Sequence, residues 1–345
     1  MILVMSGCAK RVVDNEQISP EQKLVIKFSH VVAENTPKGM AAQRFARLVQ
    51  ERTGGRVEVQ VFPNSTLYAD GEEMQALRDG AVQIIAPATS KLAGLFPSWQ
   101  LLDLPYAFVD TEAVHKTMAG PVGQKLIRSL EEQDLLALAF WDNGFKVLTN
   151  NVRPIINPAD VRGLKFRVMI NSSVLKEQFK MLGAQPVPTS FNNVYRLLEE
   201  NKVQGQENTL SNIYSKKFYR VQPYMTVTNH GYMGYVVLVN KKYWYSIPAD
   251  IRDILHETMA EVTEWERARA AELNELYYKR LRNNDAIKIT TLSPRERVAW
   301  EKAFYPVYDY LAREIGAELI DELLREKNAC KNLPSGGGST NKANN

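Results

Sequence analysis

Arg167, within the stretch GLKFRVMINSSV at residues 163–174, is a candidate ligand-binding residue in this sequence. Apolar residues alternate with Lys165 and Arg167, which predicts a short strand that places Arg167 near its end. The residues NSS that follow are helix N-cap types, so a helix is expected to begin there. A guanidinium beside the free N–H groups of a helix N-terminus favours an anion site. The alternative is an ordinary surface arginine, since charged side chains are mostly exposed.

Two more polar residues stand where predicted strands begin or end. Lys146 follows the sequence DNG, which is typical of a turn, and begins a strand, whereas Asn208 ends the strand within VQGQEN. Ligands of open parallel sheets bind at the edge formed by the carboxyl ends of the strands, so the three side chains could converge on one crevice. The alternative for each is a surface charge or, for Asn208, a helix cap.

Strands and helices alternate along the first part of the chain. A strand at residues 23–30 precedes a helix that begins at Thr36 and Pro37 and ends before Gly54 and Gly55, and a second strand follows. The pattern repeats with a helix closed by Gly80 and an apolar strand. These βαβ units predict a mainly parallel sheet with helices on both of its faces.

A second set of elements indicates a second lobe built on the same plan. Its strands are expected at residues 145–150, 164–169 and 203–207, and its helices at residues 174–182 and 192–201. The chain then returns through an apolar strand at residues 232–240 to a helical pattern over about residues 249–281, roughly 50 Å long at 1.5 Å per residue. No heptad pattern is sustained, which favours a brace across both lobes over a coiled coil.

Composition excludes several classes of protein. The 345 residues are 45% hydrophobic and 24% charged, as in globular proteins, and a formal net charge of +4 with interspersed signs does not suggest nucleic-acid binding. Two cysteines and four scattered histidines form no metal-binding pattern, so neither a metal nor a disulfide framework is expected. No nucleotide-binding or nucleophile motif is found, and we expect no catalytic residues and no cofactor.

The two ends of the chain differ from its interior. MILVMSGCAK at the N-terminus resembles the end of a bacterial lipoprotein signal, in which Cys8 would carry the lipid. It lacks a charged region and a full apolar stretch, so residues 1–21 are interpreted as the remnant of an export signal; the alternative is an N-terminus without such a role. The tail at residues 331–345 has the composition of a disordered linker.

Long motifs in this sequence resemble one family. GLKFRVM and FNNVYRLLEENKVQGQENTLSNIYSKKFYRVQPYMTVTNHGY are similar to the signature region of the solute-binding proteins of tripartite ATP-independent periplasmic (TRAP) transporters. FSHVVAENTPKG and FWDNGFKVLTNN resemble the four-carbon dicarboxylate branch of that family. The similarity runs from about Lys23 to Lys327. It implies an α/β, two-lobed periplasmic-binding-protein fold, type II-like, with hinge strands and a long helix that spans both lobes.

The resemblance also implies roles for single residues. Arg167 matches the arginine that grips a substrate carboxylate in a bidentate salt bridge, which a lysine could not reproduce. Asn208 matches an asparagine that hydrogen-bonds the acid, and Phe191 an aromatic wall of the cleft. Lys146 would meet the second carboxylate. Weaker matches are His30 and Ser90, at the ends of first-lobe strands, and Tyr232, for which core packing is the alternative.

The family implies a division of the chain and a function. Residues 22–145 with about 235–270 are expected to form the first lobe, and residues 146–234 with about 271–330 the second. The expected function is extracytoplasmic capture of a small organic acid, above all succinate, malate or fumarate, by a monomer that delivers it to TRAP membrane subunits. A ligand-sensing subunit for the same acids and, less favoured, an enzyme acting on an organic acid are the alternatives.

Overall fold

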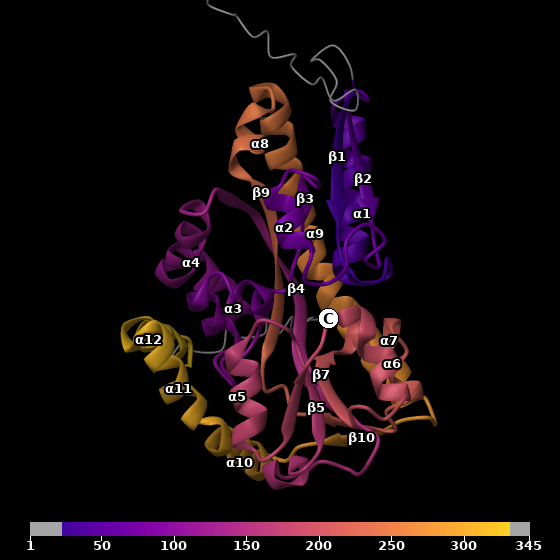
Figure 1. The fold of residues 1–345 in the computed structure, drawn as a ribbon, viewed down its shortest axis with the longest axis vertical. Helices are drawn as coiled ribbons and strands as arrows, with labels where there is room; N and C mark the ends of the chain where they lie inside the picture. Colours follow the sequence, from indigo (N-terminus) through magenta and orange to yellow (C-terminus); the bar gives the residue numbers. More distant parts are fainter. Residues whose placement is uncertain (1–22, 332–345) are drawn as a thin grey trace, which may run out of the picture.

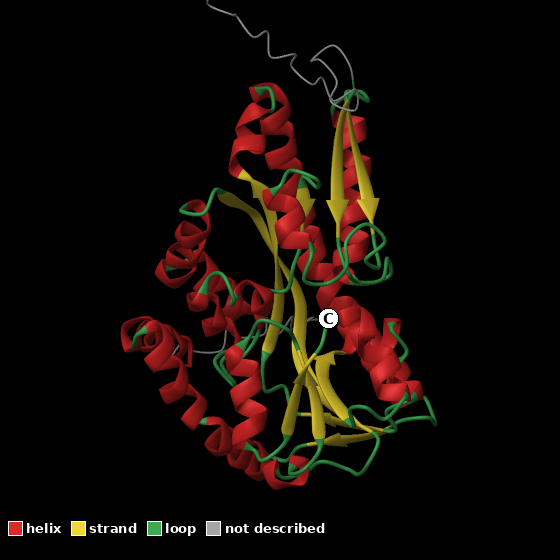
Figure 2. Cartoon of the chain, in the orientation of Figure 1, coloured by secondary structure: helices red, strands yellow, loops and turns green. Residues whose placement is uncertain are grey.

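A computed structural model describes residues 23–331, and its ten strands form one hydrogen-bonded array with helices on its faces (Figures 1 and 2). The strand order is β2-β1-β3-β9-β4-β7-β5-β6, and β8 pairs with both β4 and β10. The strands are β1 (Leu24–Ser29), β2 (Val57–Phe62), β3 (Ile84–Ile85), β4 (Leu135–Asn150), β5 (Lys165–Val168), β6 (Gln185–Pro188), β7 (Gly205–Thr209), β8 (Tyr224–Val227), β9 (Tyr232–Asn240) and β10 (Lys288–Thr291). The predicted two-lobed α/β fold is confirmed.

Helices cover both lobes. The α-helices are α1 (Pro37–Arg52), α2 (Glu73–Arg78), α3 (Thr111–Ala119), α4 (Pro121–Glu131), α5 (Ser173–Met181), α6 (Val194–Glu199), α7 (Leu210–Ser215), α8 (Lys241–Ser246), α9 (Ala249–Arg282), α10 (Pro294–Phe304), α11 (Pro306–Ile315) and α12 (Ala317–Lys331). Short 3₁₀ helices are η1 (Thr89–Leu92), η2 (Pro97–Asp103), η3 (Pro158–Val161), η4 (Phe191–Asn193) and η5 (Phe218–Arg220).

Strand β4 joins the two lobes and runs lengthwise through the molecule in Figure 1. Its residues up to Phe145 pair with β9, and those from Lys146 onward pair with β7. The sequence DNG was predicted to be a turn, and this is wrong. It forms a bulge inside a continuous strand, where the register shifts between Asp142 and Gly144 and Gly144 adopts φ 125°. Glycine tolerates this backbone conformation, so the strand bends instead of reversing.

The sheet is mixed, whereas the sequence predicted a mainly parallel one. Parallel pairs hold β1 with β2 and β3, and β5 with β6 and β7, as the βαβ pattern indicates. The hinge strand β4, however, is antiparallel to β7, β8 and β9. Strand β9 is antiparallel to β3 of the first lobe, and β4 is antiparallel to β7 of the second lobe, so each long strand opposes the βαβ strands of one lobe.

Helix α9 begins at Ala249, as predicted, and ends at Arg282 after 34 residues, about 51 Å at 1.5 Å per residue. It packs against α1 of the first lobe, the hinge strand β4 and α7 of the second lobe. Near its C-terminal end, the Tyr277 hydroxyl donates to the Asn35 carbonyl oxygen at 2.9 Å. The predicted brace is therefore present.

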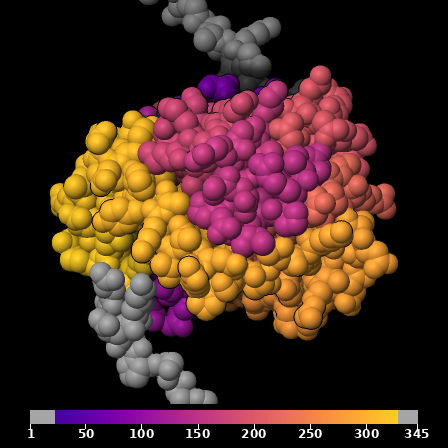
Figure 3. All heavy atoms as spheres, turned by 90° about the horizontal axis from the view of Figure 1, so that it is seen from below, coloured from indigo at the N-terminus to yellow at the C-terminus, as the bar shows by residue number. Residues whose placement is uncertain are grey.

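The C-terminal helices form a second connection between the lobes. Helix α10 packs against α5, α11 against both α5 and η2, and α12 against α3 and α4. In Figure 3 these helices flank the second-lobe segments at one end of the molecule. The predicted division assigned residues 271–330 to the second lobe, whereas α12 lies on first-lobe helices.

Candidate functional site

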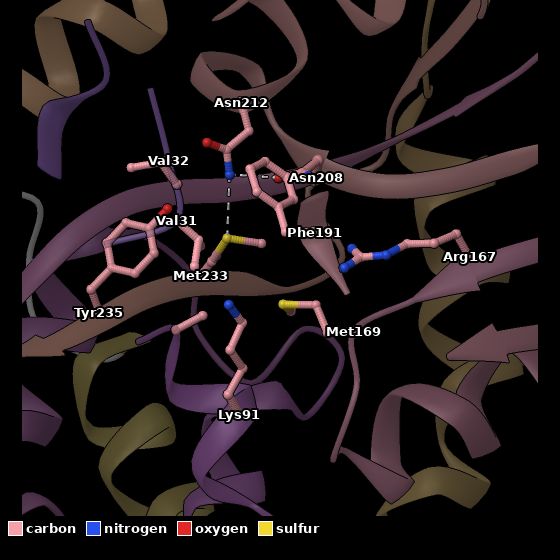
Figure 4. Close-up of a pocket in the computed structure, with 11 residues that line it drawn as sticks. Val31, Val32, Lys91, Arg167, Met169, Phe191, Asn208, Asn212, Met233 and Tyr235 are labelled. Atoms are coloured by element: carbon pink, nitrogen blue, oxygen red, sulfur yellow. Dashed lines mark hydrogen bonds between the residues drawn. The ribbon is translucent and has the colours of Figure 1, made fainter. Parts of the chain in front are cut away.

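A cavity with an empty volume of about 280 Å³ lies where the two lobes meet β9. Both lobes and β9 contribute walls, and Figure 4 shows the side chains concerned. The lining residues are Val31, Val32, Ala88, Lys91, Arg167, Met169, Phe191, Asn208, Asn212, Met233 and Tyr235. Two are cationic, three supply amide or hydroxyl groups, and the rest are apolar. Such a composition suits a small organic anion.

Arg167 reaches the cavity from the third position of β5, and its side chain is 1% exposed. Its Nε and Nη2 donate to the Thr189 carbonyl oxygen at 3.1 and 2.8 Å. These bonds fix the guanidinium plane, and Nη1 has no hydrogen-bond partner among the described residues. Burial lowers the pKa of Arg167 to about 10, so the side chain remains cationic at neutral pH. A guanidinium held in a fixed plane, with its Nη1 side free, is suited to binding a carboxylate.

Lys91 supplies the second cation, from the first lobe. It lies on η1, and its ammonium forms an ion pair with Asp70. Asp70 also accepts a hydrogen bond from the Phe191 N–H at 2.6 Å, and its own N–H donates to Asn192 Oδ1 at 3.1 Å. Burial alone would raise the pKa of Asp70, but the Lys91 ammonium and the Phe191 N–H lower it. The carboxylate therefore holds Lys91 in place and links the two lobes.

Asparagines form the polar wall beside Arg167. Asn212 Nδ2 donates to Asn208 Oδ1 at 2.8 Å, and Asn208 Nδ2 donates to Gln206 Oε1 at 3.1 Å. Gln206 pairs with Arg167 across β7 and β5. Asn208 lies two residues beyond Gln206 on the same strand, so it shares a face with Arg167. The sequence prediction that these two side chains converge is consistent with this register.

Lys146 lies behind this wall and does not line the cavity. Its ammonium donates to Glu207 Oε1 at 2.8 Å, and both side chains are fully buried. Glu207 Oε2 accepts from His230 Nε2 at 2.7 Å and from Gln178 Nε2 at 3.0 Å. Lys146 pairs with Thr209 in the ladder, so it faces the same side as Glu207 and the opposite side from Asn208. Its charge is therefore matched inside the protein.

The three weaker candidates also lie outside the cavity lining. His30 is fully buried next to the lining residues Val31 and Val32, and neither of its ring nitrogens has a hydrogen-bond partner among the described residues. The Ser90 hydroxyl donates to Asp103 at 2.6 Å. Tyr232 donates to Asp142 at 2.5 Å, with its ring packed between aromatic side chains. Tyr232 is thus packed in the core, which was the alternative to a ligand-binding role for this residue.

Several lining residues were missed by sequence reasoning. Met233 and Tyr235 lie on β9, and the alternation of strand side chains turns them to the face opposite Tyr232. Asn208 lies on β7 and Asn212 on α7, so no single periodic pattern in the sequence linked the two side chains. Lys91 follows the two-residue strand β3, which is too short to give a periodic signal.

Comparison with known proteins gives one consistent result. A model of the bacterial extracellular solute-binding proteins, family 7, matches residues 28–314. The C4-dicarboxylate-binding protein DctB of Bacillus subtilis is 49% identical over 319 residues, which cover 92% of this chain and 91% of that protein. The C4-dicarboxylate-binding periplasmic protein DctP of Rhodobacter capsulatus is 44% identical over 300 residues, 87% and 90% of the two chains.

Two similar solved structures share the fold, and each holds a four-carbon dicarboxylate. A TRAP periplasmic solute-binding protein from Sulfurospirillum deleyianum, with bound succinate, has a TM-score of 0.84 and 43% identity, covering 88% of this chain and 99% of its own. One from Pseudomonas aeruginosa, with bound L-malate, has a TM-score of 0.80 and 38% identity, covering 83% and 99%.

Proposed function

Since this chain belongs to family 7 of the bacterial extracellular solute-binding proteins, we propose that it captures a four-carbon dicarboxylate and delivers it to TRAP membrane subunits. The resemblance read from the sequence is confirmed at the level of the family. Members of this family are transport proteins and not enzymes, and we propose that this chain likewise releases its ligand unchanged. Succinate, malate and fumarate are the ligands that we favour.

One observation carries the proposal: two cations from different lobes line a single small cavity. Arg167 presents a free guanidinium edge, and Lys91 lies on the opposing lobe. In our proposal Arg167 grips one carboxylate through two parallel hydrogen bonds, while Lys91 meets the other. Among residues 23–331, no group of three or more acidic, His or Cys side chains is placed to hold a metal ion.

The other lining residues complete the proposed site. Asn208 and Asn212 supply amide groups to the ligand, and Phe191 closes the cavity on the second-lobe side. Lys91 takes the role that the sequence suggested for Lys146, which we propose acts from behind the wall by fixing Glu207. Apolar Val31 and Val32 fit the carbon chain of a short diacid and leave polar sugar hydroxyls without partners.

The protein is proposed to work outside the cytoplasm as a monomer, with Cys8 as the point of lipid attachment. Cys8 and the other residues 1–22 lie outside the described part of the chain. Within residues 23–331, none of the helices combines the length and the apolar composition needed to cross a bilayer.

A ligand panel tests this function. Thermal-shift measurements followed by calorimetric titration would compare succinate, L-malate and fumarate with butyrate, which keeps the four carbons but has one carboxylate. At a hundredfold excess over Kd, a bound ligand stabilises the protein by about 2.7 kcal/mol, so the diacids should raise Tm clearly. Butyrate and the sugar acid galactonate should not. A shift with galactonate and none with any diacid would refute the dicarboxylate assignment.

A further inference from the structure

Four ionisable side chains form a buried cluster on the first-lobe side of the cavity. They are Lys38 on α1, Asp70, Glu73 on α2 and Lys91 on η1, and Lys38, Asp70 and Glu73 are each at most 6% exposed. Among these four, only Asp70 and Lys91 form an ion pair. Each of the others lies within electrostatic reach of its neighbours, so a charge added at Lys91 affects them all.

Glu73 and Lys38 are buried without a countercharge in direct contact. Glu73 Oε1 has no hydrogen-bond partner among residues 23–331, and the side chain is 3% exposed. Lys38 donates to the Ala86 carbonyl oxygen at 2.6 Å, and its ammonium lies 3.7 Å from the centre of the Tyr235 ring. Tyr235 lines the cavity, so Lys38 is placed directly behind a cavity wall.

The charged side chains at the cavity carry one positive charge fewer than is needed to neutralise a bound dianion. Arg167 and Lys91 carry two positive charges and Asp70 one negative charge, which gives a net charge of +1. A bound dianion carries −2. A neutral Lys38 with an ionised Glu73 has a net charge of −1. One bound proton makes the pair neutral, and a second bound proton makes it +1. One added proton therefore matches the charge of the ligand.

We propose that Lys38 and Glu73 form a proton-binding site coupled to the anion cavity, so that the protein takes up a proton when it binds a dicarboxylate dianion. The inference rests on the proposed function, because it requires a dianion next to Lys91. An anion in the cavity stabilises the protonated form of both side chains. By linkage, affinity for the dianion then falls as the pH rises above neutrality.

The surrounding charges are consistent with titration near neutral pH. Burial raises the pKa of Glu73 to about 7, and Lys91 and Lys38 oppose this. Burial lowers the pKa of Lys38 to about 7, opposed by Glu73. Glu266 on α9 also faces Lys38, and burial next to Asp142 raises its pKa, so it is the rival proton acceptor. Burial lowers the pKa of the remaining neighbour, His30, to about 3, so it stays neutral.

Calorimetric titration with fumarate in buffers of different ionisation enthalpy measures the uptake directly. Fumarate is fully ionised at neutral pH, so it contributes no proton of its own. For the wild type at pH 7, the slope of the observed enthalpy against the buffer enthalpy should give an uptake of a few tenths to about one proton per ligand. Glu73→Gln should lower this number by at least half, because glutamine cannot take up a proton.

Matched variants separate this site from its rivals. Glu72→Gln, on the exposed neighbour of Glu73, should leave proton uptake at the wild-type value. Glu266→Gln should also leave most of it. If Glu73→Gln binds fumarate with undiminished uptake, or if the wild type binds with zero slope, the proton site is refuted while the proposed function stands. If no diacid binds to the wild type, the proposed function itself fails.

Discussion

Asp70 and Phe191 are joined across the two lobes: the Asp70 carboxylate accepts the Phe191 N–H at 2.6 Å, and Phe191 lines the cavity. The same carboxylate pairs with Lys91, and the Asp70 N–H donates to Asn192 Oδ1. One side chain therefore orders a cationic wall of the cavity and stabilises the closed arrangement of the lobes. Closure of a binding cleft governs how slowly a ligand leaves.

Asp70→Asn should therefore weaken binding mainly through faster dissociation. The amide loses the charge that holds Lys91 and accepts the Phe191 N–H less strongly. Hydrogen bonds to charged groups contribute about 1.5 to 3 kcal/mol, so we expect about a ten- to hundredfold loss in affinity for succinate. Stopped-flow and calorimetric titration would measure this loss. Asp309→Asn, on the exposed face of α11, is the control, and an unchanged dissociation rate in Asp70→Asn would contradict the linking role.

Substitutions of Arg167 should give a graded loss of ligand affinity. Lysine keeps the charge but loses the fork, and alanine leaves a ligand carboxylate unpaired in the closed cavity. Truncating one partner of a buried charge pair costs about 2 to 5 kcal/mol, or about thirty-fold to several thousand-fold in affinity. Calorimetric titration with the best diacid should therefore rank the wild type above Arg167→Lys and that above Arg167→Ala. Arg295→Ala, on an exposed residue, should bind normally, and full affinity in Arg167→Ala would place the clamp elsewhere.

Loss of Lys91 and loss of Lys146 should differ in their effect on succinate binding, because only Lys91 lines the cavity. Lys91→Met removes a cavity cation, so it should weaken succinate binding at least about tenfold, the effect of one charged hydrogen bond. It should also lower Tm, because the buried Asp70 carboxylate loses its ammonium partner. Lys146→Met leaves Glu207 buried without its ammonium partner, which costs about 3 to 5 kcal/mol of folding free energy. Thermal denaturation and titration of both variants measure the contrast. Weakened succinate binding in Lys146→Met, with unchanged binding in Lys91→Met, would restore Lys146 as the ligand-binding cation.

Lipid attachment at Cys8 can be tested by cell fractionation. In cells that express the gene with a complete export signal, the protein should fractionate with the membrane, and Cys8→Ala should release it. Attachment by a single acyl chain is weak, so a diacylated cysteine is expected in the mass spectrum. An unmodified Cys8 in native material would remove the claim, and Cys330→Ala serves as the matched control.

The contrast between Arg167 and Lys146 shows how far sequence could predict the site. Strand ends can be found from alternation and caps, and these signals placed Arg167 and Asn208 near one sheet edge. Which face a side chain takes depends on register, and a shift of one residue reverses it. The bulge at Gly144 and the antiparallel pairing of β4 with β7 are non-local features, so nothing near Lys146 indicated that it faces Glu207.

The long helix α9 was predictable because its signal is local in the sequence. Its apolar spacing is sustained over many turns, and its first residue was predicted at Ala249, where the structure has it. Lys91 carried no such signal, because it lies on a four-residue 3₁₀ helix after a two-residue strand. Strongly periodic elements were therefore found from the sequence, while the irregular segments that supply part of the cavity wall were not.

Acid should reveal the contribution of the buried Glu207 network to stability. Burial alone would raise the pKa of Glu207, but the Lys146 ammonium and the His230 hydrogen bond lower it to about 2. A carboxyl whose pKa is lower in the folded state stabilises that state above its unfolded pKa, near 4.5, and this contribution is lost as the pH falls toward 2. Protonation in the unfolded chain precedes protonation in the folded protein, so acid favours unfolding.

Glu207→Gln should therefore remove part of the dependence of Tm on pH. The Tm of the variant should lie well below that of the wild type at pH 7, and the two values should approach each other between pH 4.5 and pH 2.5. Glutamine keeps the shape of the side chain, so the comparison isolates its charge. Glu257→Gln, on an exposed turn of α9, should follow the wild-type curve throughout. A Tm difference that stays constant over this pH range would mean that packing, and not the ion pair with Lys146, accounts for the stability that Glu207 provides.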